Sequence, residues 1–228
     1  MRQSFILVLA AVPMLTAAPR ELEQARDRQD RSALERMASS YNSAAAKQAN
    51  DPQAQYMLAL AQSYLAEVAT ELRDRSGGRV AAETGIKAAE KAVSLKPTVA
   101  EHHRILGTLC GQVIPANVLA GLKYGRCALD SINKAIELDP KSAIAHVSRG
   151  VGNYYLPAAF GGGPDVALKD FQRAIQLDPK LAEAQLWLGI TLRKLNRNTE
   201  ARAAFTKSLQ LNPDRIWTKQ QLEKTPAR

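Results

Sequence analysis

The feature that most constrains the fold is a short pattern that recurs four times and ends each time in proline. The four copies read VSLKP, IELDP, IQLDP and LQLNP, and they end at Pro97, Pro140, Pro179 and Pro213. The spacings between these prolines are 43, 39 and 34 residues. Recurrence at such intervals is typical of repeat architectures, in which each unit packs against its sequence neighbours.

A helix is predicted immediately before each proline. Counting back from Pro213, a small, a bulky and a small residue stand at Ala201, Phe205 and Ser208, and the other copies follow the same spacing. Intervals of four and three positions place the three side chains on one helical face. Proline then ends the helix, because its nitrogen cannot donate a hydrogen bond. The first copy departs from the pattern by placing Ala89 at the bulky position.

A second helix is predicted before each of these. In the last repeat it covers residues 182–195, with Gly189 between Leu186 and Leu192. The equivalent small residues of the earlier repeats are Gly150, Gly107 and Ala61. Glycine inside a helix costs about 1 kcal/mol relative to alanine. We therefore expect a neighbouring helix to pack closely at this position.

A helix pair with these features resembles the tetratricopeptide repeat family. The resemblance covers about residues 53–213, and it departs from the family pattern at Cys110 and Asn153, where a larger apolar residue is usual. It implies an all-α fold, a right-handed α-solenoid of antiparallel helix pairs with about four repeat units and an extra helix at each end. It also implies a scaffold that binds proteins rather than a catalyst, which is an inference from the resemblance.

The chain is interpreted in four parts. They are a signal peptide (1–18), an N-terminal capping helix region (19–52), the repeat array (53–213), and a C-terminal capping helix and tail (214–228). Within the second part, Asp30 is expected to cap one helix over residues 31–48. The extra length of the first three repeats is placed between the helices of each pair, in long loops at residues 71–79, 111–126 and 156–165.

The first eighteen residues have the pattern of a secretory signal peptide. Arg2 is followed by an apolar run over residues 5–15 and by the small residues Ala17 and Ala18. The run is shorter than the roughly 20 residues that a membrane span needs. We therefore expect an exported protein, periplasmic or secreted, that is soluble after removal of the peptide and has no transmembrane span. An uncleaved amphipathic N-terminus is the alternative.

The residues that carry chemistry are sparse. The run Gly161-Gly162-Gly163 lacks the Gly-Lys-Ser/Thr ending of a phosphate loop, and the adjacent His102 and His103 point about 100° apart on a helix. We predict no enzyme, no metal and no cofactor. Two other functions stay open: an accessory protein of a transport system that handles a solute, and, less favoured, an enzyme that uses polar groups of the loops.

The two cysteines and the uneven charge each leave two interpretations. Cys110 and Cys127 belong to facing helices of the second repeat, and they either form a disulfide in an oxidising compartment or remain buried thiols. The chain carries a net charge of +9, and residues 193–228 hold nine basic residues against three acidic ones. Export argues against nucleic acid as a partner and favours an acidic protein or an anionic envelope surface. A solvated basic end is the alternative.

Partner-binding residues are predicted on the first helices of the repeats, which line the concave face in the family, and in the loop of the third repeat. They are Arg104, Thr108, Gln112, Val151, Tyr154, Tyr155, Phe160, Gly161, Gly162, Gly163 and Lys194. Leu58 and Ile105 stand where polar groups would be needed to clamp a peptide carboxylate, so a peptide C-terminus is not favoured as the ligand.

The loop of the third repeat carries the most specific hypothesis. Three successive glycines permit positive φ and the close approach of a partner, and Asp165 is expected to cap the next helix. We predict a fixed loop beside the groove in which Tyr154, Tyr155 and Phe160 contribute to binding. The alternative is that Phe160 anchors the loop to the stack and that the glycines only make the turn.

Overall fold

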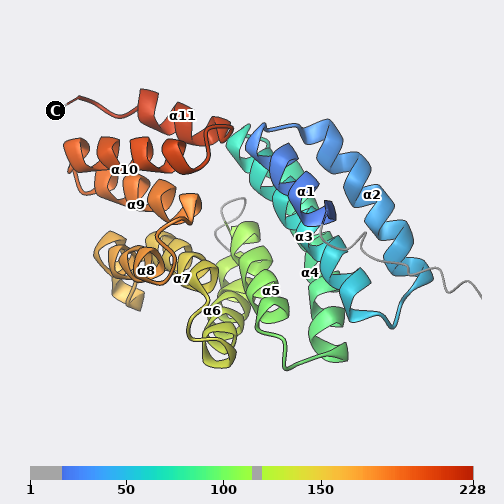
Figure 1. Ribbon diagram of the computed structural model, residues 1–228. Helices are drawn as coiled ribbons and strands as arrows, with labels where there is room; N and C mark the ends of the chain where they lie inside the picture. Colours follow the sequence, from blue (N-terminus) through green and yellow to red (C-terminus); the bar gives the residue numbers. More distant parts are fainter. Residues whose placement is uncertain (1–16, 115–119, 228) are drawn as a thin grey trace, which may run out of the picture.

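The fold is a curved stack of antiparallel helix pairs (Figure 1). The computed structural model describes residues 17–114 and 120–227, and every regular element within those ranges is helical. The predicted all-α solenoid is therefore confirmed. Its elements are α1 (Ala17–Asp27), α2 (Arg31–Lys47), α3 (Pro52–Glu71), α4 (Arg75–Leu95), α5 (Ala100–Val113), α6 (Ala120–Leu138), α7 (Ala143–Tyr155), the 3-10 turn η2 (Ala158–Phe160), α8 (Pro164–Leu177), α9 (Ala182–Lys194), α10 (Asn198–Leu211) and α11 (Ile216–Glu223).

Four helix pairs form the repeats: α3 with α4, α5 with α6, α7 with α8, and α9 with α10. In Figure 1 the stack bends so that α9 to α11 come back toward α1 and α3. The first helices of successive repeats contact one another along the inner side, α3 against α5, α5 against α7, and α7 against α9. The inner surface is therefore built from the first helix of every repeat.

The small residue of each first helix lies under the bulky residue of its partner helix. A Cβ atom placed on Gly189 would lie 2.6 Å from Cε1 of Phe205, and one on Gly150 would lie 2.5 Å from Cε1 of Phe171. Both phenylalanine side chains are fully buried. A methyl group has no room in either contact, which confirms the close packing expected from the glycines.

The extra length of the first repeat lies in its helices, so the long loop predicted at residues 71–79 is wrong. Helix α3 continues to Glu71 and α4 begins at Arg75. Asp74 starts α4 by accepting a hydrogen bond from the amide of Gly77 at 2.8 Å. This side-chain cap satisfies a free amide of the first turn and helps the helix to begin before the glycines.

The predicted loops of the second and third repeats, at residues 111–126 and 156–165, differ in what the structure shows of them. Residues 115–119, in the middle of the link predicted at 111–126, lie outside the described part. In the third repeat, α8 begins at Pro164, whose missing amide hydrogen suits the first position of a helix. Gly163 rather than Asp165 precedes this helix, and no side-chain hydrogen bond caps it. The predicted Asp165 cap is therefore wrong.

The N-terminal region contains one helix more than predicted. Asp30 caps α2 as expected, by accepting a hydrogen bond from the amide of Ala33 at 2.9 Å. Before it, α1 packs against α2 and α3, with Leu22 fully buried. Most of the predicted signal peptide, residues 1–16, lies outside the described residues. Within the described ranges, no helix combines the length and the apolar character that crossing a membrane requires.

Candidate functional site

A pocket of about 520 Å³ lies on the inner side of the stack. Helix α1 contributes Glu23, Arg26 and Asp27 to its lining, and the first helices α3, α5 and α9 contribute Tyr64, Glu101, Arg104 and Glu183 among others. Leu60, Ile144, Leu181 and Leu211 supply apolar wall between these groups. Because α1 was not predicted, the pocket and its charge were not predicted either.

Two guanidinium groups of the pocket are each held by a carboxylate. Arg104 donates two hydrogen bonds to Glu101, from Nε at 2.6 Å and from Nη2 at 2.5 Å. Arg26 donates to Oδ1 of Asp27 from Nε at 3.0 Å and from Nη2 at 2.7 Å, and it lies over the ring of Tyr64. Burial opposes ionisation of Glu101, but the Arg104 guanidinium lowers the pKa of that carboxyl below its ordinary value.

The three predicted binding residues of α5 are used mainly in contacts between repeats. The side chains of Arg104 and Thr108 both donate to Oγ of Ser148 on α7, each at 3.3 Å. Gln112 exchanges hydrogen bonds with Ser63 on α3, donating to its carbonyl at 3.1 Å and accepting from its hydroxyl at 3.2 Å. Of the three, Arg104 lines the pocket. Thr108 and Gln112 join α5 to its neighbours.

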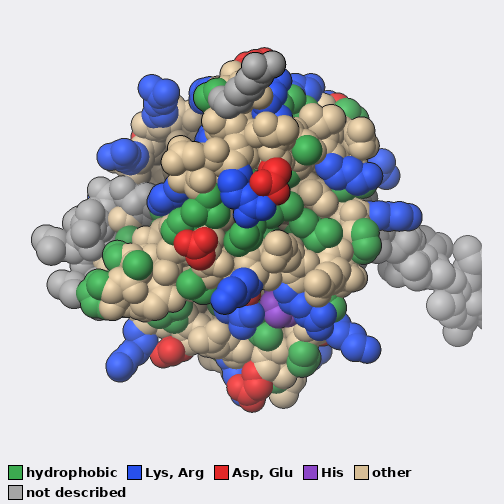
Figure 2. Space-filling view, turned by 90° about the vertical axis from the view of Figure 1, so that its left-hand side faces the viewer, with side chains coloured by type: hydrophobic (Ala, Val, Ile, Leu, Met, Phe, Trp, Pro, Cys, Tyr) green, Lys and Arg blue, Asp and Glu red, His purple; other side chains and the backbone are tan. Residues whose placement is uncertain are grey.

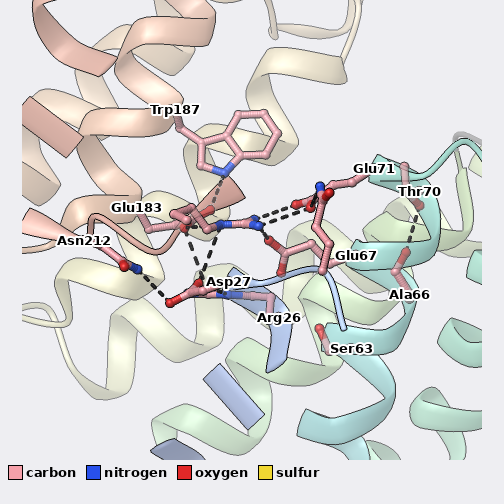
Figure 3. Close-up of polar contacts among 12 residues, drawn as sticks. Arg26, Asp27, Ser63, Ala66, Glu67, Thr70, Glu71, Glu183, Trp187 and Asn212 are labelled. Carbon is pink, nitrogen blue, oxygen red and sulfur yellow. Dashed lines mark hydrogen bonds and ion pairs between the residues drawn. The ribbon is translucent and has the colours of Figure 1, made fainter. Parts of the chain in front are cut away.

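A buried arginine lies behind the pocket lining, close to Asp27 and Glu183. Arg215, just before α11, is 1% exposed, and its Nη2 donates to Glu67 and to Glu71 at 2.5 Å each. Its Nε lies 3.7 Å from Asp27 and 3.8 Å from Glu183. Figure 3 shows these four carboxylates, which come from α1, α3 and α9, pointing toward one another.

Negative charge exceeds positive charge in this cluster. Four carboxylates surround two guanidinium groups, those of Arg26 and Arg215. Burial raises the pKa of Glu67 to about 8; Arg215 and Arg26 oppose this rise, and the neighbouring Glu183 and Glu71 add to it. The cluster therefore favours a protonated Glu67 near neutral pH.

The basic C-terminal region is partly turned inward. Arg193 donates to the carbonyl of Gln221 at 3.0 Å, and Arg202 donates to the carbonyl of Thr225 at 2.7 Å. Together with Arg215, these side chains hold the C-terminal segment against the last repeat and the first. The exposed basic residues of the region include Lys207, Lys219 and Lys224. Contact of this end with an anionic surface stays a prediction.

Aromatic side chains meet where α7 ends. The rings of Tyr154 and Tyr155 lie 5.0 Å apart, and Nζ of Lys194 lies 4.5 Å from the centre of the Tyr154 ring. Tyr155 is 58% exposed and Phe160 is 76% exposed. We call Tyr154, Tyr155, Phe160 and Lys194 the aromatic surface. Figure 2 faces the C-terminal repeats and shows hydrophobic side chains gathered there among lysine and arginine side chains.

The loop that carries Phe160 is folded back on α7. The amide of Gly163 donates to the carbonyl of Asn153 at 2.8 Å, and Gly161 and Gly163 have φ of +83° and +112°. A Cβ atom on Gly162 would collide with the carbonyl oxygen of Leu156. The glycines therefore make the turn, but the exposed Phe160 does not anchor it, so that part of the alternative interpretation is wrong. Val151 lies on α7, one helical turn before Tyr155, and packs against the buried residues around Phe171.

Cys110 of α5 and Cys127 of α6 form a disulfide, with an S–S distance of 2.01 Å. It joins the two helices of the second repeat across the link that contains residues 115–119. Among the described residues, no group of three or more histidine, cysteine, aspartate or glutamate side chains is arranged to hold a metal ion.

Comparison with protein families gives two matches. The family model described as Regulator of microtubule dynamics protein 1-3 matches residues 19–156, and one described as Tetratricopeptide repeat matches residues 158–216. The second match confirms the resemblance seen in the sequence, and the chain is a tetratricopeptide repeat protein. No curated protein matches the chain in sequence.

Several solved structures match the chain to different degrees. TTC0263, a thermophilic TPR protein of Thermus thermophilus, is 21% identical, with 91% of this chain and 98% of that chain covered and a TM-score of 0.63. YrrB, described as a TPR protein with an unusual peptide-binding site, is 20% identical with 84% of each chain covered and a TM-score of 0.43. MamA of Desulfovibrio magneticus is 18% identical, with 87% and 97% covered and a TM-score of 0.46. The likeness to TTC0263 shows the fold alone.

Proposed function

The chain belongs to the family described as Regulator of microtubule dynamics protein 1-3, and we propose that it is an exported, non-catalytic scaffold that binds a protein or peptide partner in the cell envelope. The observation that carries this proposal is the display of Tyr155 and Phe160, two large hydrophobic side chains that are more exposed than buried. Both belong to the aromatic surface: Tyr155 ends α7, and Phe160 lies in the following loop, whose backbone is held by hydrogen bonds.

A fixed aromatic surface suits partner binding for two reasons. Aromatic side chains contribute most of the binding energy at many protein interfaces. A loop that is already ordered loses little conformational entropy when the partner binds. Lys194 adds a positive charge over the ring of Tyr154. We therefore expect the partner segment to be apolar and to carry a carboxylate that reaches Lys194.

The chemistry of the inner side supports a scaffold rather than an enzyme. Arg104 and Arg26 are each engaged by a carboxylate of the same pocket, and Arg215 is engaged by two. Paired groups of this kind stabilise a fold more readily than they transfer protons. The pocket itself favours the second function considered above, the handling of a small solute, because its volume of about 520 Å³ is in the range of small-molecule sites.

Capture from the envelope fraction of the source organism tests the scaffold function. Wild type, Phe160→Ala and the control Val80→Ala serve as baits, and polymerised tubulin is an additional binding target because of the family description. Val80 is a matched control, since it is also an exposed hydrophobic residue (55%) but lies on α4, away from the aromatic surface. A partner that is retained by wild type and Val80→Ala and lost by Phe160→Ala supports the proposal. Equal recovery with all three baits contradicts it.

Export is tested separately by the intact mass of the protein from its native host. We expect a mature chain that begins near residue 18 or 19. A protein that retains Met1 would contradict the exported location.

A further inference from the structure

The inner pocket carries an excess of negative charge that the rest of the molecule does not share. Its lining includes the carboxylates of Glu23, Asp27, Glu101 and Glu183 and the guanidinium groups of Arg26 and Arg104. With all six groups ionised, the lining carries a charge of −2, although the whole chain carries +9. Arg215, behind this lining, does not offset the excess, because its charge is matched by Glu71 even when Glu67 is protonated.

Among the described residues of the pocket lining, Glu183 and Glu23 are the carboxylates that accept no hydrogen bond from an arginine. The nearest guanidinium atoms to Glu183 are Nε of Arg215 at 3.8 Å and Nη1 of Arg26 at 3.9 Å, both beyond hydrogen-bonding distance. Its hydrogen-bond donor is the neutral indole of Trp187, at 3.2 Å. Within the part of the chain that the structure describes, Glu23 takes part in no ion pair. Both carboxylates therefore remain available to an incoming cation.

The arginines do not make the pocket an anion site. Arg104 is joined to Glu101 by two short hydrogen bonds, and Arg26 is joined to Asp27 in the same way. Each guanidinium is thus neutralised by a carboxylate on its own helix. An anion entering the pocket would meet the carboxylate of Glu183, and to reach an arginine it would have to displace Glu101 or Asp27.

The apolar part of the lining selects the kind of cation. Leu60, Ile144, Leu181 and Leu211 face the same space as the carboxylates, and the volume of about 520 Å³ is far larger than a hydrated metal ion needs. An aliphatic stem would cover these leucine and isoleucine side chains, and burial of apolar area is favourable. A charged amine at its end would lie among the carboxylates.

We propose that the inner pocket binds an organic cation with an aliphatic stem, namely a diamine or polyamine, or the lysine side chain of a partner segment. The pocket and the aromatic surface use different residues, so this site does not depend on partner binding at Tyr155 and Phe160. The two sources share one chemistry, an ammonium group on a methylene chain, and they are separated by the choice of probe.

Isothermal titration calorimetry of the full chain with three matched probes tests the site. The probes are 1,5-diaminopentane, its neutral analogue 1,5-pentanediol and the dianion glutarate. A short peptide with one central lysine, with its norleucine version as control, tests the second source. We expect the diamine or the lysine peptide to bind and the diol, glutarate and norleucine peptide not to bind. Binding of the diamine assigns the site to a free amine, whereas binding of the lysine peptide alone assigns it to a partner side chain.

Variants locate the binding. Glu183→Gln should weaken binding about tenfold, because it removes one charge from a largely buried side chain. Glu23→Gln, tested separately, should weaken binding by a smaller factor, because the Glu23 carboxylate is exposed. Glu137→Gln is the matched control, an exposed glutamate on α6 that pairs with Lys134, and it should bind as wild type does. If circular dichroism shows that Glu183→Gln is unfolded, the affinity of Glu23→Gln alone decides whether the amine binds in the pocket. The proposal is overturned if no amine probe binds at millimolar concentration, if glutarate or the diol binds as well as the diamine, or if the Glu137→Gln control loses as much affinity as the pocket variants.

Discussion

Arg215 donates hydrogen bonds to both carboxylate oxygens of Glu71, at 3.1 Å and 2.5 Å, although 144 positions separate the two residues. The contact joins the segment before α11 to the first helix of the first repeat. Solenoid repeats usually contact only their neighbours, whereas here the last element of the array reaches the first (Figure 1). The contact lies beside the inner pocket, because Arg215 is also 3.7 Å from Asp27 and 3.8 Å from Glu183, which line it.

Loss of the Arg215 side-chain charge should destabilise the whole chain. Arg215→Met keeps much of the side-chain length but leaves Glu71, which is 2% exposed in its side chain, without its guanidinium partner. Removing one member of a buried ion pair costs about 3–5 kcal/mol. Urea unfolding measures the change, with Lys219→Ala on the exposed face of α11 as the control. A loss below about 0.5 kcal/mol, the usual effect of a surface substitution, would show that the closure does not stabilise the fold.

Glu67 should make the protein less stable as the pH rises. Its pKa in the folded chain is about 8, raised by burial from an ordinary value of 4.5. The folded state therefore binds a proton more tightly than the unfolded state. This contribution to stability is fully present below pH 4.5 and is lost as the pH rises through about 8.

Urea unfolding of wild type and Glu67→Gln at a series of pH values between about 5 and 8.5 checks this dependence. We expect the unfolding free energy of wild type to fall over this range and that of Glu67→Gln to fall less steeply, because glutamine does not ionise. Parallel curves for the two proteins would refute the assignment to Glu67.

Two glycines on the same helix should respond in opposite directions to alanine. In Gly150→Ala the new methyl group would lie 2.5 Å from the ring of Phe171, so we expect a loss of about 1–3 kcal/mol from overpacking. In Gly152→Ala, two residues further along α7, the methyl group would meet no atom within 4 Å. Alanine should then stabilise the helix by up to about 1 kcal/mol. Thermal melting of both variants measures the difference, and similar shifts would mean that the glycine–phenylalanine contact is not close.

The disulfide should leave no free thiol in the unreduced protein. Thiol titration after unfolding without reductant is expected to give none for Cys110 and Cys127. The chain-entropy estimate for a closed loop of this length is about 3 kcal/mol, so reduction should lower the unfolding free energy by a comparable amount. Two titratable thiols in protein isolated from its native host would contradict the bond.

The helix pairs were predictable because their pattern is local. The small position at Gly189 and the bulky position at Phe205 lie within one repeat, and a period of three and four residues reveals both. The start of α4 was mispredicted because Gly77 and Gly78 resemble a loop, while the capping hydrogen bond of Asp74 outweighs their low helix propensity. The residue composition of the segment does not show whether the capping hydrogen bond or the low propensity of the glycines prevails.

The candidate site was only partly predictable. The aromatic loop was found because three glycines beside tyrosines and a phenylalanine are conspicuous in a single stretch. The pocket was missed because its lining includes residues of α1, and because two of its carboxylates lie near Arg215, whose partners are between 32 and 188 positions away. No periodic or short-range signal in one sequence pairs such residues, and Arg215 was instead counted with an exposed basic end.

The central claim is that the aromatic surface binds a partner. The most direct test is the affinity of the captured partner for Tyr155→Ala, Phe160→Ala and the control Val80→Ala. The melting temperature of each variant is measured as well. Truncation of an aromatic anchor typically costs about 2 kcal/mol or more. We predict that Tyr155→Ala and Phe160→Ala bind at least about tenfold more weakly than wild type while melting within about 2 °C of it, because both side chains are exposed. Wild-type affinity in both variants, or a loss of affinity that only follows a loss of stability, would contradict the account.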